Sequence, residues 1–240
     1  MAQIDDELIG PAMVASQRVA DSLAMRILSG ELPPGTRIKQ DELASELQTS
    51  RIPVRDALRI LESRGLVTLK ANSGARVATL TLRDMEISYE IREKLEPMLL
   101  AESMPHLTEG DLDKMRVAKA KLEAVRDVAD YLPLSRDFHW TAFSRGQSIL
   151  LERIVGRLWD VTHSYRLAYA KLALQDAARM RIMCDERDLL FGAIERGELD
   201  LAPRILALHI RRTHLVLRDF GDLTIVMGAG GVKGAGVATS

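Results

Sequence analysis

The chain of 240 residues contains only one cysteine, Cys184. A single thiol cannot form a disulfide within the chain, and it cannot build a zinc site that depends on several cysteine ligands. The N-terminus also lacks a charged start followed by a long apolar core, so it does not resemble a secretory signal peptide. These absences predict a cytoplasmic protein.

An excess of charge and a long apolar run are also missing. Lys and Arg together number 33 and Asp and Glu 34, so the formal net charge is −1. A nucleic-acid surface would therefore have to be confined to one part of the chain. Residues 14–78 do contain more basic residues than acidic ones, ten against seven. No run approaches the ~18 apolar residues that a membrane helix needs. We expect no membrane partner.

Motifs of common enzyme classes are absent as well. The sequence has no phosphate-binding glycine loop, no nucleophile motif, and no carboxylates at convincing metal-ligand spacing beside its histidines. It also shows no fixed repeat and no coiled-coil heptads. A metal-dependent enzyme that uses His139 and His209 is therefore the weakest of the alternatives.

The first eighty residues carry the signals of a small mixed domain. Apolar residues recur at helical spacing over 14–29 and 40–47, with the turn "LPPGTRI" between them. Ser50 is placed to cap a third helix over 51–64. The segments "LVTLK" and "ARVAT" then flank "ANSG", which is typical of a hairpin. The pattern predicts a winged helix-turn-helix over residues 14–79, after an N-terminal tail at 1–13.

The stretch "QTSRIPVRDALRILESRGLV" places arginines one turn apart along one side of the third helix. Its apolar residues Val54, Leu58 and Leu61 form the opposite stripe. Such a row is often only a solvated charged face. After a tight turn between two helices it favours DNA recognition, because arginine can donate two parallel hydrogen bonds to guanine in the major groove.

The segment "ILSGELPPGTRIKQDELASELQTSRIPVRDALRILESRGLVTLKANSGARV" resembles the DNA-binding domain of the GntR family of transcriptional regulators. Gln48 departs from the family's usual glycine in the turn, and we expect slight backbone strain there. The resemblance and the helix pattern together predict contacts with double-stranded DNA from the following residues: Arg37, Ser50, Arg51, Pro53, Arg55, Arg59, Asn72 and Gly74.

After Thr81 strand signals disappear and the pattern predicts only helices, at 82–103, 108–127, 131–145, 148–171, 175–196 and 199–219. We therefore expect a mainly α protein, with an all-helical bundle over residues 80–221 and a glycine-rich tail over 222–240.

Several polar residues interrupt the apolar stripes of these helices. Arg92, His139, Arg187 and His209 each lie in line with apolar neighbours, and a buried guanidinium needs an acidic partner, solvent or an anionic ligand. Each one alone could instead be a satisfied core histidine, or an arginine whose charged end reaches solvent. Together, on separate helices, they favour a pocket. Arg166 and Tyr169 are weaker candidates, for which exposed positions are expected.

The helical part resembles the FadR-like branch of the family, through "YEIREKLEPMLLAES", "SRDFHWTAF" and "ERDLLFGAIERGELDLAPRILALHI". That resemblance implies an effector-binding domain in which an Asp and three histidines hold a divalent metal such as zinc or nickel. Here His139 and His209 match, whereas Ser135 and Arg187 occupy the other two positions. Two imidazoles alone bind such a metal weakly, so we expect a small carboxylate effector, bound by Arg92, Ser135, His139, Arg166, Arg187 and His209.

The sequence thus predicts a homodimeric regulator, acting as a repressor, whose two winged helices bind a near-palindromic operator and whose helical domain senses an organic acid. Two alternatives keep the DNA-binding domain: a helical domain that binds metal, and one that only dimerises.

Overall fold

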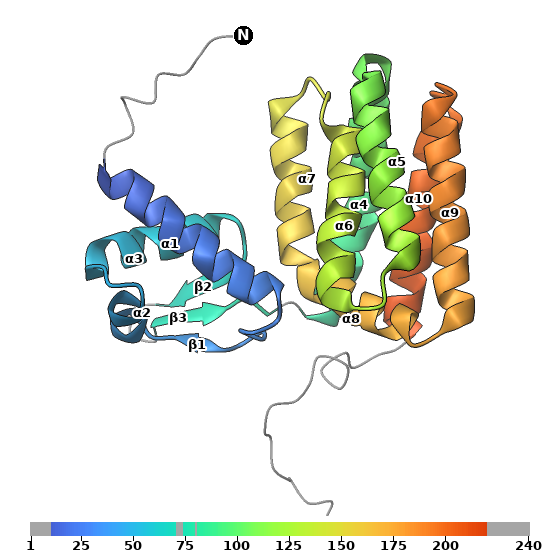
Figure 1. The fold of residues 1–240 in the computed structure, drawn as a ribbon. Helices are drawn as coiled ribbons and strands as arrows, with labels where there is room; N and C mark the ends of the chain where they lie inside the picture. Colours follow the sequence, from blue (N-terminus) through green and yellow to red (C-terminus); the bar gives the residue numbers. More distant parts are fainter. Residues whose placement is uncertain (1–10, 71–73, 80, 220–240) are drawn as a thin grey trace, which may run out of the picture.

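The computed structural model describes residues 11–70, 74–79 and 81–219. They form an N-terminal domain with three helices and a small sheet, followed by a bundle of helices (Figure 1). Each part has its own buried apolar cluster. The predicted mainly α architecture is confirmed. No helix within the described ranges is long and apolar enough to span a membrane.

The N-terminal domain contains the predicted helix-turn-helix. Helices α1 (Pro11–Leu28), α2 (Gln40–Glu46) and α3 (Arg51–Ser63) precede the hairpin strands β2 (Val67–Lys70) and β3 (Gly74–Val77). A short strand β1 (Arg37–Ile38) pairs with β3, which gives the antiparallel order β1-β3-β2. The sequence predicted only a turn there, because two residues are too few to show alternation. The buried face of α3 packs against α1 (Figure 1).

The turn between α2 and α3 contains the expected strained residue. Gln48 has φ of 49°, the only positive φ of a non-glycine residue in the ranges that the structure describes. A side chain in this left-handed region costs ~1–2 kcal/mol, because Cβ crowds the following carbonyl. The prediction made from the missing glycine is confirmed.

The helical domain differs from the predicted pattern at one helix. Its elements are α4 (Leu82–Ser103), the 3₁₀ helix η2 (Met104–His106), α5 (Glu109–Ala124), α6 (Val128–Phe143), α7 (Ile149–Val161), α8 (His163–Leu174), α9 (Ala177–Glu195) and α10 (Leu201–Asp219). The single helix expected over 148–171 is wrong, since it breaks at Thr162. No proline or glycine marks the break, so the periodicity ran through it.

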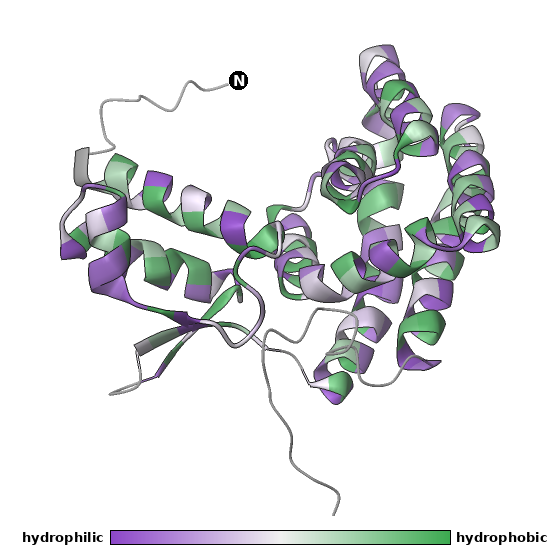
Figure 2. Cartoon of the chain, turned by 60° about the horizontal axis from the view of Figure 1, so that its bottom comes forward, coloured by the Kyte–Doolittle hydropathy of each residue, from purple (hydrophilic) through white to green (hydrophobic). Residues whose placement is uncertain are grey.

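Hydrophilic and hydrophobic residues alternate along the helices of the bundle (Figure 2), and the buried apolar residues of these helices form one core cluster. Helix α4 packs along α10, and α5 packs along α6. Helix α8 lies at the end of the bundle nearest the N-terminal domain (Figure 1).

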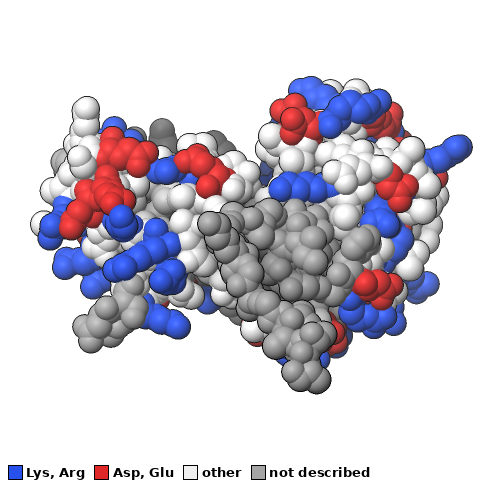
Figure 3. All heavy atoms as spheres, turned by 90° about the horizontal axis from the view of Figure 1, so that it is seen from below, with Lys and Arg blue, Asp and Glu red and all other residues white. Residues whose placement is uncertain are grey.

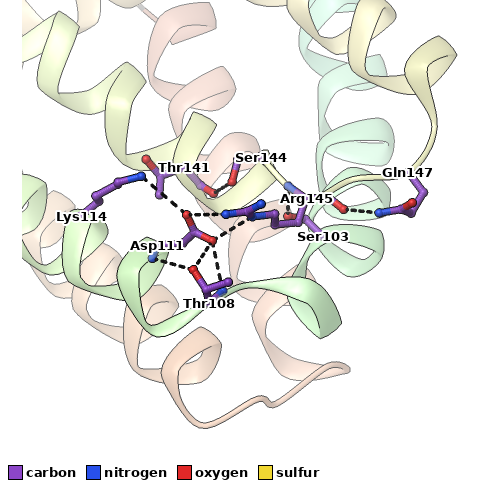
Figure 4. A network of polar contacts seen from close by, with 8 residues as sticks. All are labelled: Ser103, Thr108, Asp111, Lys114, Thr141, Ser144, Arg145 and Gln147. Atoms are coloured by element: carbon purple, nitrogen blue, oxygen red, sulfur yellow. Dashed lines mark hydrogen bonds and ion pairs between the residues drawn. The ribbon is translucent and has the colours of Figure 1, made fainter. Parts of the chain in front are cut away.

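A polar network fixes the opposite end of the bundle (Figure 4). Thr108 and Asp111 form a capping box at the start of α5, and Arg145, just after α6, donates from Nε to the Asp111 carboxylate at 2.9 Å. The hydrogen bonds from Arg145 and Thr108 lower the pKa of Asp111. The Arg145 backbone N–H also donates to Ser103 at the end of α4. Asp111 and Arg145 together therefore join three helix ends.

Replacing Gln48 with glycine should relieve the strain and raise the free energy of unfolding of the N-terminal domain by about 1 kcal/mol. Hydrogen exchange of the α3 amides would measure the change. Gln48→Ala is the matched control, since it removes the side chain but keeps Cβ. An equal gain in both variants would contradict the strain.

Candidate DNA-binding surface and ligand cavity

Helix α3 presents the predicted arginines to solvent. Ser50 is its N-cap residue, as expected, although its side chain makes no capping hydrogen bond. Arg51 and Arg59 have side chains 74% and 65% exposed, and Arg55 is also exposed, so all three are open to a ligand. Basic side chains gather on the part of the N-terminal domain that faces the viewer in Figure 3.

Two of these arginines already have acidic neighbours. Arg51 pairs with Asp41 of α2, and Arg59 lies 3.8 Å from Asp56. Both pairs are exposed, and such pairs contribute little, so DNA can displace the acids. Arg55, by contrast, makes no ion pair with the described residues. Pro53 is buried in the first turn of α3, which disfavours the predicted contact of this residue with DNA.

The sheet adds basic residues beside the helix. Arg37 on β1 lies directly opposite Arg76 on β3, and both are exposed. Like charges at opposed positions repel, which makes this pair suited to a phosphate. Gly74 has φ of 79° and open space around it, and Asn72 lies outside the described residues. Sequence reasoning missed Arg76, although its alternation with buried Ala75 and Val77 could have placed it outward.

The bundle contains a small cavity of about 50 Å³. Five of the six predicted pocket residues line it, namely Arg92, Ser135, His139, Arg166 and His209. They come from α4, α6, α8 and α10, which the chain brings together from positions far apart in the sequence. The aromatic rings of Tyr89, Tyr131, Trp159 and Tyr169 complete much of the wall.

Arg92 is 5% exposed and pairs with Glu96 one turn later on α4. Its guanidinium also lies over the Tyr89 ring, 4.7 Å from the centroid, and Nη1 is 3.5 Å from Thr162 Oγ1. Glu96 is fully buried, and its Oε2 makes no hydrogen bond with the described residues. The sequence reasoning asked for an acidic partner but did not identify Glu96, whose i,i+4 spacing from Arg92 was the available signal.

Arg166 and Tyr169 lie in the cavity wall, so the exposed positions expected for them are wrong. Arg166 donates to the Trp159 carbonyl oxygen and stacks 4.1 Å from the centroid of the Trp159 ring. Its Nε makes no hydrogen bond with the described part of the chain. Burial and the nearby charge of Arg92 lower the pKa of Arg166 to about 9. No acidic partner of this guanidinium lies in the ranges that the structure describes.

Arg187 is 5% exposed but does not line the cavity. It donates from Nη2 to the Tyr131 hydroxyl at 3.0 Å, and that tyrosine does line the cavity. Arg187 is therefore not placed to contact a ligand in this cavity directly. Arg187 instead supplies positive charge one layer behind the wall and orients Tyr131.

The two predicted histidines are neighbours. The rings of His139 and His209 stack with centroids 5.9 Å apart, and His139 Nδ1 donates to the Ser135 carbonyl oxygen at 2.8 Å. Burial, and then the charge of His209, lower the pKa of His139 to about 3, so its ring is neutral near pH 7. Neutral imidazole with a bonded Nδ1–H leaves only Nε2 as a metal ligand.

His209 has an acidic partner that the sequence did not reveal. Glu186 accepts from His209 Nδ1 at 2.7 Å and also pairs with Arg212. Burial opposes ionisation of Glu186, but these two donors lower its pKa to about 2. The carboxylate is thus already engaged by His209 and Arg212. No group of three or more His, Cys, Asp or Glu side chains in the described ranges can hold a metal. This donor set does not fit a divalent ion.

Polar and close contacts join the cavity to the DNA-binding domain. Asp160 lies at the end of α7 and is 6% exposed. It accepts a hydrogen bond of 2.8 Å from Nε of Arg64, the residue that directly follows α3. Next to it, Gly65 approaches Val161 so closely that a Cβ would lie 2.2 Å from Val161 Cγ1. His163 Nε2 bonds the Leu28 carbonyl oxygen of α1. We call Arg64, Gly65, Asp160 and Val161 the interdomain joint.

A winged helix with an exposed row of arginines, linked to an all-helical domain, is the architecture of a DNA-binding transcriptional regulator. The family model "Bacterial regulatory proteins, gntR family" matches residues 15–77, and the FCD domain model matches residues 86–212. The chain belongs to the GntR family of transcriptional regulators and carries an FCD domain. Its relatives are transcriptional regulators and not enzymes.

Curated relatives cover most of the chain. The gluconate operon transcriptional repressor of Bacillus subtilis is 42% identical over 198 residues, which cover 80% of this chain and 79% of the relative. A probable D-xylose utilization operon transcriptional repressor of Paenarthrobacter nicotinovorans is 29% identical over 206 residues, covering 82% and 85%.

A solved structure of McbR/YncC from E. coli has the same fold, with a TM-score of 0.75 and 24% identity over 86% of this chain and 98% of that chain. At this identity the likeness concerns the fold alone.

The low pKa of His139 predicts how the free energy of unfolding depends on pH. His139 binds a proton near pH 6.5 in the unfolded chain and only near pH 3 in the folded chain. Protonation between these pH values therefore favours the unfolded chain. Below pH 6.5 the free energy of unfolding should therefore fall by up to about 1.4 kcal/mol per pH unit more in the wild type than in His139→Asn. Denaturant titrations from pH 6.5 to 4.5 would measure both slopes. The exposed His106→Asn should keep the wild-type slope, and equal slopes in all three proteins would contradict the burial of a neutral His139.

Proposed function

We propose that this protein is a homodimeric repressor whose operator affinity falls when a small hydroxy acid binds the cavity of the helical domain. The observation that carries the proposal is the excess of buried positive charge around that cavity. Arg92, Arg166 and Arg187 are matched there by the single carboxylate of Glu96, while Glu186 is taken up by His209 and Arg212.

A carboxylate ligand fits this charge balance. Arg166 and Arg92 supply guanidinium groups that can donate two hydrogen bonds to a carboxylate, and Tyr131 is oriented from behind by Arg187. The proposed contacts also include Ser135, His139 and His209 on the opposite wall. The name of the B. subtilis relative, the gluconate operon repressor, supports a sugar acid as the ligand class. A volume of about 50 Å³ is far below the usual ~300 Å³ of ligand pockets, so binding requires the cavity to widen.

On the DNA side, Arg51 and Arg55 are the proposed base-reading residues, and Arg37, Arg59, Ser50 and the start of the wing at Gly74 are proposed phosphate contacts. One recognition helix reads few bases, and a two-fold pair reading a near-palindromic site doubles them. Ile52, which is 61% exposed between the arginines, is an added candidate for contact with a thymine methyl group.

The interdomain joint gives the cavity a route to the DNA-binding domain. Arg92 contacts Thr162, and Arg166 holds the Trp159 carbonyl oxygen, so both cationic groups touch the chain on either side of Asp160 and Val161. When a carboxylate draws these groups toward itself, the α7–α8 break shifts and carries Arg64 with it. The acid can change operator affinity only by its differential affinity for the two arrangements.

Arg51→Ala or Arg55→Ala should weaken binding to the preferred operator by about ten- to a hundredfold, since a bidentate guanine contact contributes ~1–3 kcal/mol. The operator would first be selected from random duplexes with the wild-type protein, and affinities measured by fluorescence anisotropy. The exposed Arg83→Ala on α4 is the control and should bind normally. Undiminished discrimination in both variants would remove these residues from the interface.

Arg187→Met should leave operator affinity unchanged and weaken gluconate-induced release at least tenfold. The substitution removes a buried guanidinium with no acidic partner among the described residues, so no unpaired carboxylate remains and folding is retained. Release of labelled operator against gluconate concentration is the readout. Arg181→Met, exposed on the same helix α9, should respond like the wild type. An unaltered dose response of Arg187→Met would exclude Arg187 from the ligand-binding machinery.

Arg64→Gln tests the joint itself. It should bind operator and gluconate separately with wild-type affinities, while the factor by which gluconate weakens operator binding becomes smaller. Asp160 keeps Arg136, 3.4 Å away, as a partner in this variant, so its charge is not left alone. The exposed Arg153→Gln on α7 should retain full coupling, and full coupling in Arg64→Gln would show that the signal takes another path.

A further inference from the structure

A second cavity lies between the two domains, and the function proposed above does not use it. Its volume is about 390 Å³. The walls come from the end of α1 in the DNA-binding domain and from the first half of α6 and the start of α8 in the helical domain. We call it the interdomain cleft. Its volume lies within the ~300–1,000 Å³ of small-molecule sites, in contrast to the cavity inside the bundle.

The walls of the interdomain cleft are mainly aliphatic. Leu28 comes from α1, Val128 and Leu132 from α6, and Leu167 from α8. Water in such a hollow finds few hydrogen-bond partners, so an apolar ligand gains by replacing it. These walls favour an aliphatic chain over a sugar or a nucleotide.

The polar groups of the cleft are cationic or neutral. Arg136 and Arg166 line it, and no acidic residue does. Nε of Arg166 makes no hydrogen bond with the described residues. Arg136 has a side chain 38% exposed, lies 3.4 Å from Asp160 and stacks 5.2 Å from the centroid of the Trp140 ring. His163 also lines the cleft, and burial followed by the charge of Arg166 lowers its pKa to about 3, which leaves it neutral. The charge pattern selects an anion.

We propose that the interdomain cleft binds a medium-chain aliphatic monocarboxylate, with the carboxylate at Arg136 and Arg166 and the chain along Leu28, Leu132 and Leu167. Such a ligand contacts both domains at once and is a second input to DNA binding, separate from the hydroxy acid. The cleft and the inner cavity share Leu132 and Arg166 as a common wall. The two sites therefore influence each other through that wall.

Isothermal titration with butanoate, hexanoate and octanoate tests the proposal. Affinity should rise about fourfold for each added methylene, because each buried CH₂ contributes ~0.8 kcal/mol. Octan-1-ol, which has the same chain without the charge, should bind at least tenfold more weakly than octanoate. Equal affinities for the acid and the alcohol would contradict recognition by the arginines.

Ala129→Trp and Ala178→Trp form a matched pair. Both alanines are exposed, and each backbone N–H is capped by an aspartate at the start of its helix, but only Ala129 lines the cleft. Ala129→Trp should weaken octanoate binding at least tenfold, and Ala178→Trp should bind like the wild type. Unchanged binding by Ala129→Trp, or no binding by the wild type, would overturn the site.

The inner cavity is tested separately. Arg187→Met should keep the wild-type affinity for octanoate, because Arg187 lies away from the cleft. Loss of octanoate binding in that variant would place the fatty acid in the inner cavity and overturn the proposal. Failure of gluconate to bind the wild type would disprove the function proposed above, and it would leave the octanoate measurements unaffected.

Discussion

The helical domain is organised around buried positive charge that its own carboxylates do not balance. Arg92 has Glu96. Among the described residues, Arg166 contacts a carbonyl oxygen and the face of Trp159, and Arg187 contacts a tyrosine hydroxyl. Removing guanidinium groups from water costs several kcal/mol each unless charge and hydrogen bonds replace the solvent. Burial is the first cause that lowers the pKa values of Arg166 and His139, and neighbouring positive charge lowers them further. An anion bound inside the bundle would relieve it.

The same charge connects the ligand cavity to the recognition helix. Arg92 and Arg166 reach the short segment where α7 ends and α8 begins, and that segment also holds Arg64 through Asp160. Gly65 is required beside it, because any side chain there would meet Val161. If α7 and α8 were one continuous helix, this segment could not shift when Arg92 and Arg166 move. The break at Thr162 is thus the feature on which the proposed control of DNA binding depends.

Much of the fold could be predicted from the sequence, because local signals determined it. The helix-turn-helix and wing have caps, turns and apolar stripes that occur close together in the chain, and even the positive φ of Gln48 followed from a missing glycine. The break between α7 and α8 could not be predicted, since no proline or glycine marks it and the apolar periodicity continues through it.

The candidate site was predictable only in part for a similar reason. Polar residues within apolar stripes indicated Arg92, His139 and His209 correctly as cavity residues. Burial of Arg166 and the pairing of Glu186 with His209 depend on contacts between helices that are distant in sequence, and periodicity does not report them. Arg187 lies behind Tyr131 and not in the cavity wall. Helical periodicity shows that a residue faces inward, but it does not show whether the side chain lines a cavity or lies behind its wall.

Family resemblance implies a divalent metal in this domain, and the residues present disagree with it. Ser135 and Arg187 stand where two ligands would be, and Glu186 is engaged by His209 and Arg212. The most direct measurement is calorimetric titration of chelator-treated protein with gluconate, and of a second sample with zinc. We predict one gluconate per chain without metal and no saturable zinc site. Binding of one zinc per chain, with gluconate bound only after zinc is added, would contradict the assignment of this cavity to a fixed arginine charge.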